Sequence, residues 1–410
     1  MPVAFRYRDF RLLWLGEFVS ATGSAMFYIA LNVQMYRLTH SPAALGLIGV
    51  ARFAPTVLLS LPGGVFADAH NRKKILYVTQ SLIALCSLLL ALATYTHAVT
   101  PALLYLLTAV VAAAVAFDLP ACGALLPTLV ARKDLPAASS VYEVLWQAAN
   151  VIGPGLAGVL IAAIGVGGVY SIDVVSTTAV ILALALMTTR GEPTGDKRSV
   201  SLAARREGLV FLTAKPLLWS TLLLDFLSTL LASVTVLLPV YAATVLHVGP
   251  QGLGFMYAAP DVGAILMGVF IATRGLRIRN QGRVLLVAIV VYAVSTIIFG
   301  LSRAYPLSLL ALALVGASDT VSVVIRQNIH QLATPDALRG RLSSIDMVSF
   351  MGGEQLGALE AGLLAAAIGA PFAVVLGGVA TLGTAAITAI VAPALRHYRS
   401  SAGSMAEETA

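Results

Sequence analysis

The 410-residue sequence has too little charge for a water-exposed globular protein of its size. Charged residues make up 11% of the chain and apolar residues 59%, whereas a typical soluble domain carries about 25% charge. The mean hydropathy is +0.90. The composition therefore indicates an integral membrane protein.

Cysteine is also scarce, because Cys86 and Cys122 are the two in the chain and both lie in apolar runs. This excludes a secreted scaffold held by disulfides. The six histidines do not cluster, so we expect no metal site, and the HExxH, phosphate-loop and dinucleotide-binding motifs are absent from the sequence. We therefore expect no cofactor, no ATP-driven step and no enzyme. The formal charge of +7 comes from short basic clusters between apolar stretches, a distribution that argues against a nucleic-acid partner.

Long apolar segments dominate what is present. A helix needs about 20 mostly apolar residues to cross the hydrocarbon layer, and the sequence offers twelve such segments. The predicted spans are 12–35, 43–66, 75–95, 102–126, 138–164, 169–187, 217–246, 252–273, 284–301, 306–329, 342–368 and 372–395. The first has no cleavage pattern of a signal peptide, so we expect it to remain in the mature protein.

The basic residues predict the orientation of these spans. If the N-terminus is cytoplasmic, nearly all of the 26 Lys and Arg residues fall in cytoplasmic loops, and only Arg37 and Arg303 lie in loops on the other side. This bias follows the positive-inside rule. We therefore expect a multi-pass protein of the cell (inner) membrane with both termini in the cytoplasm.

The two halves of the chain resemble each other weakly. The segment from Gly158 to Gly165 is echoed by the segment from Gly362 to Gly369, and Asp118 is answered by Asp319 at a similar offset. Two parallel repeats of six spans are the arrangement in which one half rocks against the other. We predict an N-terminal bundle at 1–189, a cytoplasmic linker at 190–215, a C-terminal bundle at 216–396 and a flexible tail at 397–410. Within the linker, 201–215 is either a helix on the membrane surface or a solvated segment.

A family resemblance follows from these features and from one loop. The segment 63–74, GGVFADAHNRKK, resembles the G-x-x-x-D-x-x-x-R-K/R-K/R motif of the major facilitator superfamily. The segments 10–16, 254–260 and 331–336 are similar to the enterobactin-exporter and macrolide-efflux branch. The resemblance covers the whole chain and implies an all-α membrane fold of twelve transmembrane helices in two pseudo-symmetric six-helix bundles.

The charged loop has two readings. Asp68, Arg72 and Lys73 belong to the motif, and in the resembled family it is linked to a gate that stabilises the outward-open state. Alternatively, the basic residues serve only as a topology anchor.

Several acids lie inside predicted spans, where an unpaired charge is costly and by default marks a pathway or a proton site. By rise per residue, Asp225, Asp261 and Glu354 lie near the midplane and Asp319 lies below it, while Glu17, Asp118 and Asp346 are nearer the cytoplasm. Asp173 and Glu360 lie nearer the outside and are expected as rim residues. The alternative for each acid is a structural ion pair or a hydrogen bond between helices.

The resemblance narrows this set. In the resembled fold, spans 1, 4, 7 and 10 line the central cavity, which favours a proton-coupling or substrate-binding role for a subset of the acids. The candidates are Asp225, Asp319, Glu17, Asp118 and Asp261. The same fold places span 2 against span 11, so we predict a gating or structural pair between Arg52 and Glu354. Arg326 is expected to reach the cytoplasmic headgroups.

Span 5 contains an antiporter-like motif. Gly153, Pro154 and Gly158 match parts of the superfamily's G-P-x-x-G-G pattern, with Ala157 replacing one glycine. Proline bends a helix and glycine allows close approach of neighbouring helices, although ordinary small-residue packing is the alternative. Span 4 carries Asp118 where many proton-linked exporters of the superfamily have an arginine, so coupling through that arginine is not expected.

The sequence thus predicts a secondary-active exporter of small amphipathic molecules, siderophore or drug-like, that works by alternating access with proton antiport. The partners expected are the substrate, protons and the bilayer, and a monomer suffices because the repeat supplies both halves. An importer or uniporter of a metabolite is the alternative within transport. A membrane receptor or an intramembrane enzyme is the alternative from another class.

Overall fold

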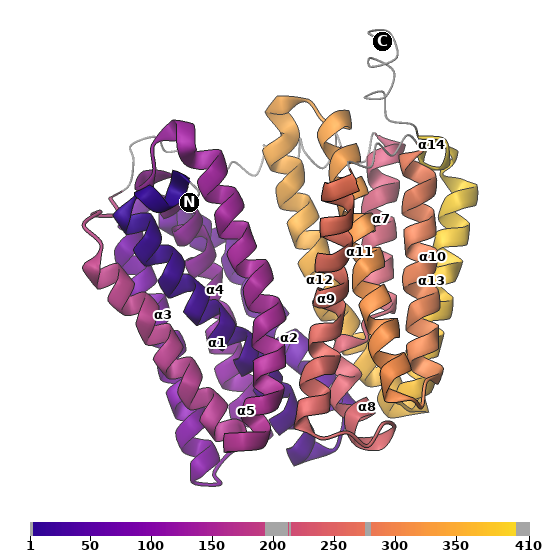
Figure 1. The fold of residues 1–410 in the computed structure, drawn as a ribbon, viewed down its shortest axis with the longest axis horizontal. Helices are drawn as coiled ribbons and strands as arrows, with labels where there is room; N and C mark the ends of the chain where they lie inside the picture. Colours follow the sequence, from indigo (N-terminus) through magenta and orange to yellow (C-terminus); the bar gives the residue numbers. More distant parts are fainter. Residues whose placement is uncertain (1–2, 193–211, 213–214, 275–279, 399–410) are drawn as a thin grey trace. The chain divides into compact units, whose positions relative to one another are not determined.

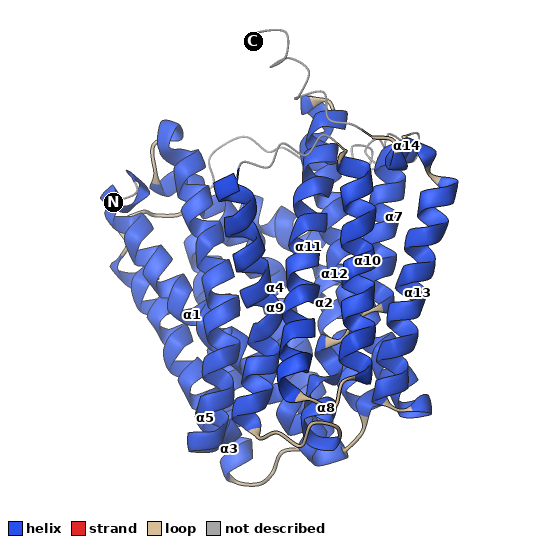
Figure 2. Cartoon of the chain, turned by 45° about the vertical axis from the view of Figure 1, so that its right-hand side comes forward, coloured by secondary structure: helices blue, strands red, loops and turns tan. Residues whose placement is uncertain are grey.

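The computed structural model describes residues 3–192, 212, 215–274 and 280–398, without the side chains of 61, 336–341, 343–345, 347–348, 350 and 351. Figures 1 and 2 show that helices and loops make up this part of the chain, with no strand in it. Most of the predicted linker and of the predicted tail lies outside the described residues.

The chain forms two compact units. The helices of the first part are η1 Val3–Arg6, α1 Arg8–Thr39, α2 Pro42–Ala69, α3 Arg72–Tyr95, α4 Pro101–Leu129, η2 Arg132–Asp134 and α5 Leu135–Leu186. Those of the second part are α7 Pro216–Leu231, η3 Thr235–Leu237, α8 Leu238–Thr244, α9 Pro250–Arg274, α10 Gln281–Leu301, α11 Tyr305–Ala333, α12 Asp336–Ile368, α13 Ala370–Val391 and α14 Pro393–Arg396. Residues 247–258, with the start of α9, cluster with the first unit and the remainder of α9 with the second. The predicted bundle boundaries stay a prediction.

Capping side chains and prolines mark the first turns of α2, α3 and α4. The side chains of Ser41, Asn71 and Thr100 each accept a hydrogen bond from a backbone amide of the first turn of α2, α3 and α4. Such caps satisfy amides that have no partner within the helix. Pro42 and Pro101 stand at the start of α2 and α4, where a missing N–H costs nothing.

Two glycines turn the chain at equivalent places of the repeat. The predicted spans 138–164 and 169–187 form one long element, α5, whose backbone departs from helical geometry at Gly165 (φ 75°). Gly369, which aligns with Gly165 in the sequence repeat, separates α12 from α13 with φ 87°. Side chains rarely tolerate this region of positive φ, whereas glycine enters it freely.

Ten described helical stretches are long and apolar enough to cross a membrane. One of them, Arg132–Leu186, has 55 residues and turns at Gly165, so it contains two crossings. Helix α12 has the length but more polar residues, and it supplies the twelfth. Large apolar side chains such as Leu58, Ile390 and Val391 are 73–78% exposed, as expected of surfaces that meet lipid.

The predicted span 217–246 corresponds to Pro216–Thr244, which is long and apolar enough to cross a membrane but contains a break. Helix α7 ends at Leu231, and the chain resumes as η3 and α8. Pro239, at the start of α8, has no amide to continue a helix from the preceding turn. The Tyr292 hydroxyl donates to the Ala232 carbonyl oxygen (3.3 Å) and so satisfies one acceptor at the break.

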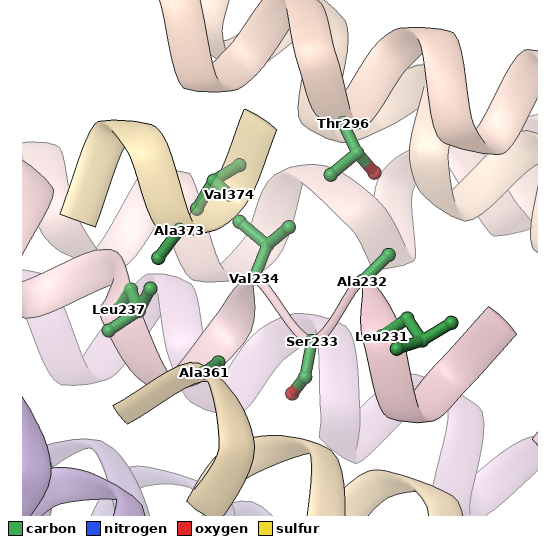
Figure 3. A pocket seen from close by; sticks show the side chains of 9 residues that line it. All are labelled: Leu231, Ala232, Ser233, Val234, Leu237, Thr296, Ala361, Ala373 and Val374. Atoms are coloured by element: carbon green, nitrogen blue, oxygen red, sulfur yellow. The ribbon is translucent and has the colours of Figure 1, made fainter. Parts of the chain in front are cut away.

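Close helix contacts surround this break. A Cβ on Gly377 of α13 would lie 2.1 Å from the Leu231 carbonyl oxygen, and one on Gly357 of α12 would lie 2.7 Å from that of Leu230. Figure 3 shows residues 232–234 running between two helices. These residues line a cavity of about 10 Å³. That volume is close to what a single water requires.

Equivalent helices of the two repeats pack closely against each other, α2 against α4 in the first unit and α9 against α11 in the second. In the first unit, a Cβ on Gly63 of α2 would lie 2.3 Å from the Ala116 carbonyl oxygen of α4. In the second, one on Gly263 of α9 would lie 1.8 Å from the Ala313 carbonyl oxygen of α11. These glycines bring α4 and α11, which carry Asp118 and Asp319, into contact with their neighbours.

Candidate functional site

A carboxyl pair lies inside the first unit. Glu17 of α1 and Asp118 of α4 are 4% and 8% exposed, and their charges lie close enough to repel each other. Neither forms an ion pair with a described cation. Sequence analysis named both residues, and the structure brings them together.

The two acids have different surroundings. Asp118 accepts a short hydrogen bond from the Thr79 hydroxyl and another from the Gln80 amide (3.1 Å), both from α3. Glu17 lies 4.0 Å from the Cys122 sulfur, which in turn lies 3.1 Å from the Tyr142 hydroxyl oxygen. Two donors therefore stabilise a charge on Asp118, whereas only a weak thiol donor faces Glu17.

Asp173 differs from its expected position at a solvated rim. Its side chain is 1% exposed and accepts a hydrogen bond from the Ser87 hydroxyl of α3 (2.6 Å). A Cβ on Gly23 of α1 would lie 2.9 Å from its Oδ1. Rise along a helix gives the depth of a residue but not its direction, so sequence analysis missed this buried contact.

An ion pair joins two helices of the second unit. Asp225 of α7 and Arg326 of α11 form a salt bridge, with side chains 8% and 10% exposed. The expectation that Arg326 reaches headgroups is therefore wrong, because its guanidinium turns inward to an acid that would otherwise be buried alone. The pair gives Asp225 a fixed partner.

A histidine and a second acid lie beside this pair. His330 Nδ1 lies 2.7 Å from Asp346 Oδ2 of α12, and its Nε2 lies 2.8 Å from the Thr221 hydroxyl oxygen of α7. No role was predicted for His330 from the sequence, because the six histidines do not cluster there. The four-residue spacing from Arg326 to His330 places both on one face of α11, and this spacing was the signal available in the sequence.

The remaining acids of the second unit have few polar contacts. Asp319 of α11 and Glu354 of α12 both interact electrostatically with the Tyr292 hydroxyl of α10. Asp261 of α9 forms neither a hydrogen bond nor an ion pair with another described residue. Glu354 is exposed on its helix.

The charged loop binds the end of α5. The Arg72 amide donates to the Gly191 carbonyl oxygen (2.9 Å), and Lys73 Nζ donates to that of Met187 (2.7 Å). Asp68, the acid of the motif, is exposed. These contacts lie inside the first unit, and the gating role of the loop stays a prediction.

The N-terminal segment is tied to the same region. Asp9 accepts hydrogen bonds from the Thr188 hydroxyl and from both the amide and hydroxyl of Thr189. The Tyr7 hydroxyl donates to Asp134 (2.7 Å), and this bond raises the pKa of Tyr7. Hydrogen bonds therefore join three segments into one rim: the start of α1, the loop after α2 and the end of α5.

Arg52 finds an aromatic partner. Its guanidinium lies 4.0 Å from the centre of the Tyr28 ring, a cation–π contact that stabilises a charge among apolar surroundings. The predicted partner, Glu354, belongs to the other unit. The pairing of Arg52 with Glu354 stays a prediction.

The antiporter-like motif makes close helix contacts. A Cβ on Gly153 would lie 2.6 Å from that of Ala25 in α1, and one on Gly158 would lie 2.6 Å from the Cα of Gly254. Gly254 is in the part of α9 that clusters with the first unit. Helix α5 passes Pro154 with helical dihedral angles and departs from them at Gly165, so packing is the role with direct geometric support.

Solved structures with this fold are membrane transporters. A bacterial homologue of the human lysosomal transporter Spinster, in an inward-facing and occupied conformation, has a TM-score of 0.74 at 17% identity over 96% of this chain and 97% of that one. A bacterial homologue of the iron transporter ferroportin has a TM-score of 0.70 at 16% identity over 93% and 98%. These likenesses show that this chain has the fold of those structures.

Sequence comparison gives the family. Residues 2–407 match the model of the transmembrane secretion effector family, and the chain belongs to it. The enterobactin exporter EntS of Escherichia coli K12 is 27% identical over 390 residues, which cover 95% of this chain and 93% of the relative. EntS of Citrobacter koseri is 28% identical over 87% of this chain and 85% of the relative. The protein is a multi-pass membrane transporter and not an enzyme.

Proposed function

We propose that this transporter exports small amphipathic molecules, siderophore or drug-like, by alternating access coupled to proton entry. The direction is supported by relatives that are named enterobactin exporters. The coupling is supported by one observation above all, the buried pair of Glu17 and Asp118 without a described cation.

The pair can hold a proton for a physical reason. Two ionised carboxylates close together in a low-dielectric interior repel each other and lose their hydration, so one proton shared between them lowers the free energy. Thr79 and Gln80 stabilise the charge on Asp118, which leaves Glu17 to carry the proton. A proton that enters from outside neutralises Glu17, and its release to the cytoplasm recharges the pair.

The fixed charges have a different part in the proposal. Asp225 is balanced by Arg326, so it shapes the field of the second unit without exchanging a proton itself. Asp319 and Asp261 remain candidates for contact with the substrate or a proton. We place the transporter in the inner membrane as a monomer with both termini in the cytoplasm.

The test is accumulation in an efflux-deficient bacterium that expresses the protein. Catecholate siderophores, macrolides and cationic dyes are offered with and without a protonophore. We expect the wild type to lower accumulation of at least one compound and the protonophore to abolish the effect. Glu17→Gln and Asp118→Asn should reduce this component to background, because neither neutral amide can exchange the proton.

Asp173→Asn is the matched control, because Asp173 is an equally buried acid of the same unit with hydroxyl partners. It should retain export at equal expression. Export that persists in the Glu17→Gln/Asp118→Asn double variant and remains sensitive to the protonophore would contradict the role of the pair. Accumulation that rises with wild-type expression would favour an importer.

A further inference from the structure

Five polar side chains from three helices, four buried and one partly exposed, form a cluster in the second unit, which we call the His330 cluster. Its members are Thr221 and Asp225 of α7, Arg326 and His330 of α11, and Asp346 of α12. His330 is 6% exposed and Asp346 30%. The cluster is separate from the Glu17–Asp118 pair, which belongs to the first unit.

The contacts of His330 can accommodate a proton on both ring nitrogens. The Thr221 hydroxyl lies 2.8 Å from the Leu218 carbonyl oxygen and 2.8 Å from His330 Nε2, and when it donates to Leu218 it accepts from the ring. The ionised Asp346 carboxylate is also an acceptor. In that arrangement both ring nitrogens face an acceptor, and an imidazole that donates twice is a cation.

Charge balance leads to the same state independently. Asp225 and Asp346 bring two negative charges, whereas Arg326 brings one positive charge and also attracts Asp346. Asp346 Oδ1 is buried without a hydrogen-bond partner among the described residues. A proton on His330 makes the cluster neutral, and neutrality is favoured because four of the five side chains are buried from the water that would solvate an excess charge.

Other titratable groups around α11 do not replace His330. Helix α10 carries Arg283, which is exposed, and Tyr292, whose hydroxyl binds the Ala232 carbonyl oxygen. On α9, Arg274 is exposed and stacks over Phe270. Asp261 of α9 and Asp319 of α11 lie two or more helical turns farther along the bundle, near the Pro260–Gly316 contact.

We propose that the His330 cluster is a second proton-binding site of the transporter, with His330 as the group that takes up and releases the proton. The protonated ring ties α11 to α7 through Thr221 and to α12 through Asp346. Loss of the proton removes one of these donors and leaves one carboxylate uncompensated, which loosens α7 and α12 from α11. Exchange takes place at the end of α11 near Ala333, on the side that the basic loops predict to be cytoplasmic.

This inference rests on the proposed function, since it adds a second cytoplasmic release step, at His330, to that of the Glu17–Asp118 pair. A proton bound at the cluster holds three helices together, and its departure to the cytoplasm frees them to rearrange. The occupancy of the ring nitrogens can nevertheless be measured without any transport.

The first experiment is nitrogen NMR of the full-length protein, labelled with 15N-histidine and placed in nanodiscs near neutral pH. His330→Gln assigns the signal by its loss. We expect both His330 nitrogens to be protonated, and we expect Asp346→Asn to abolish this state because it removes the counter-charge. His397, which is exposed, serves as the internal reference. A wild-type His330 with a single ring proton, equal to His397 in its titration, overturns the proposal.

The second experiment measures substrate efflux in proteoliposomes while the pH on the cytoplasmic face is varied. We expect the wild-type rate to depend on that pH and His330→Gln to transport with a flat profile. His330→Asn and Asp346→Asn provide further variants if His330→Gln does not fold. A protonated His330 together with an unchanged pH profile in a folded His330→Gln variant overturns the release role. A protonated His330 in a protein that exports nothing overturns the proposed function and leaves the proton site standing.

Discussion

At the scale of single residues, we expect the buried ion pair of Asp225 and Arg326 to contribute measurably to the stability of the protein. Removal of one partner leaves the other as an uncompensated buried charge, which typically costs about 3–5 kcal/mol. We expect Asp225→Asn and Arg326→Gln each to lower the thermal unfolding midpoint in nanodiscs. The double variant should unfold at a higher temperature than Arg326→Gln alone, because it also removes the Asp225 charge that has lost its partner.

The neighbouring Asp346 complicates this comparison, since it also attracts Arg326. Arg326→Gln should therefore be the more damaging single variant, because it deprives two acids of their cation. If the two single variants lose equal stability, and the double variant loses the sum of the two, the residues do not interact.

The partners of the acids inside the spans were the feature of the site that the sequence predicted least well. The acids in the spans were recognisable, because charge is rare in an apolar run. Their partners were not, since depth follows from rise per residue while direction depends on how each helix is rotated in its bundle. Thus Glu17 and Asp118 were named separately, Arg326 was assigned to headgroups, and His330 was given no role.

At the scale of helices, the break after α7 depends on small residues in two neighbours. The Leu231 carbonyl oxygen approaches α13 at Gly377, where an added Cβ would lie 2.1 Å away. We expect Gly377→Ala to destabilise the protein by about 1–3 kcal/mol, as overpacking generally does. Gly383→Ala in the same helix is the matched control, because nothing lies within 4 Å of a Cβ there.

The two substitutions have the same chemistry and differ only in the space available. The midpoint temperature of thermal unfolding in nanodiscs should therefore fall for Gly377→Ala. It should stay level or rise for Gly383→Ala, since alanine is a better helix former than glycine. Equal midpoints for both variants would mean that α13 shifts away from α7 at little cost.

Helix boundaries were largely predictable from the sequence, and this break was not. Apolar character continues through 217–246, so hydropathy gives no sign of an interruption. The available signals were Pro239 and the β-branched residues Val234, Thr235 and Val236, which are local and weak. The turns at Gly165 and Gly369 were easier, because a repeated glycine marked both.

At the scale of the whole molecule, the distribution of basic residues predicts one orientation in the membrane. Arg37 and Lys74 are both exposed and stand on opposite sides in that arrangement. The two native cysteines are buried, so the wild type should react poorly with a thiol reagent and serve as its own background. We expect a membrane-impermeant maleimide to label Arg37→Cys in intact cells and Lys74→Cys only after the membrane is opened.

The outcome bears on the direction of transport, because orientation fixes which face of the transporter meets the cytoplasm. With Lys74 inside, the rim formed by the start of α1, the loop after α2 and the end of α5 is cytoplasmic, and so is the end of α11 that carries His330. Labelling of Lys74→Cys in intact cells would reverse both assignments. The proton would then leave the His330 cluster toward the outside, and proton antiport through it would no longer drive export.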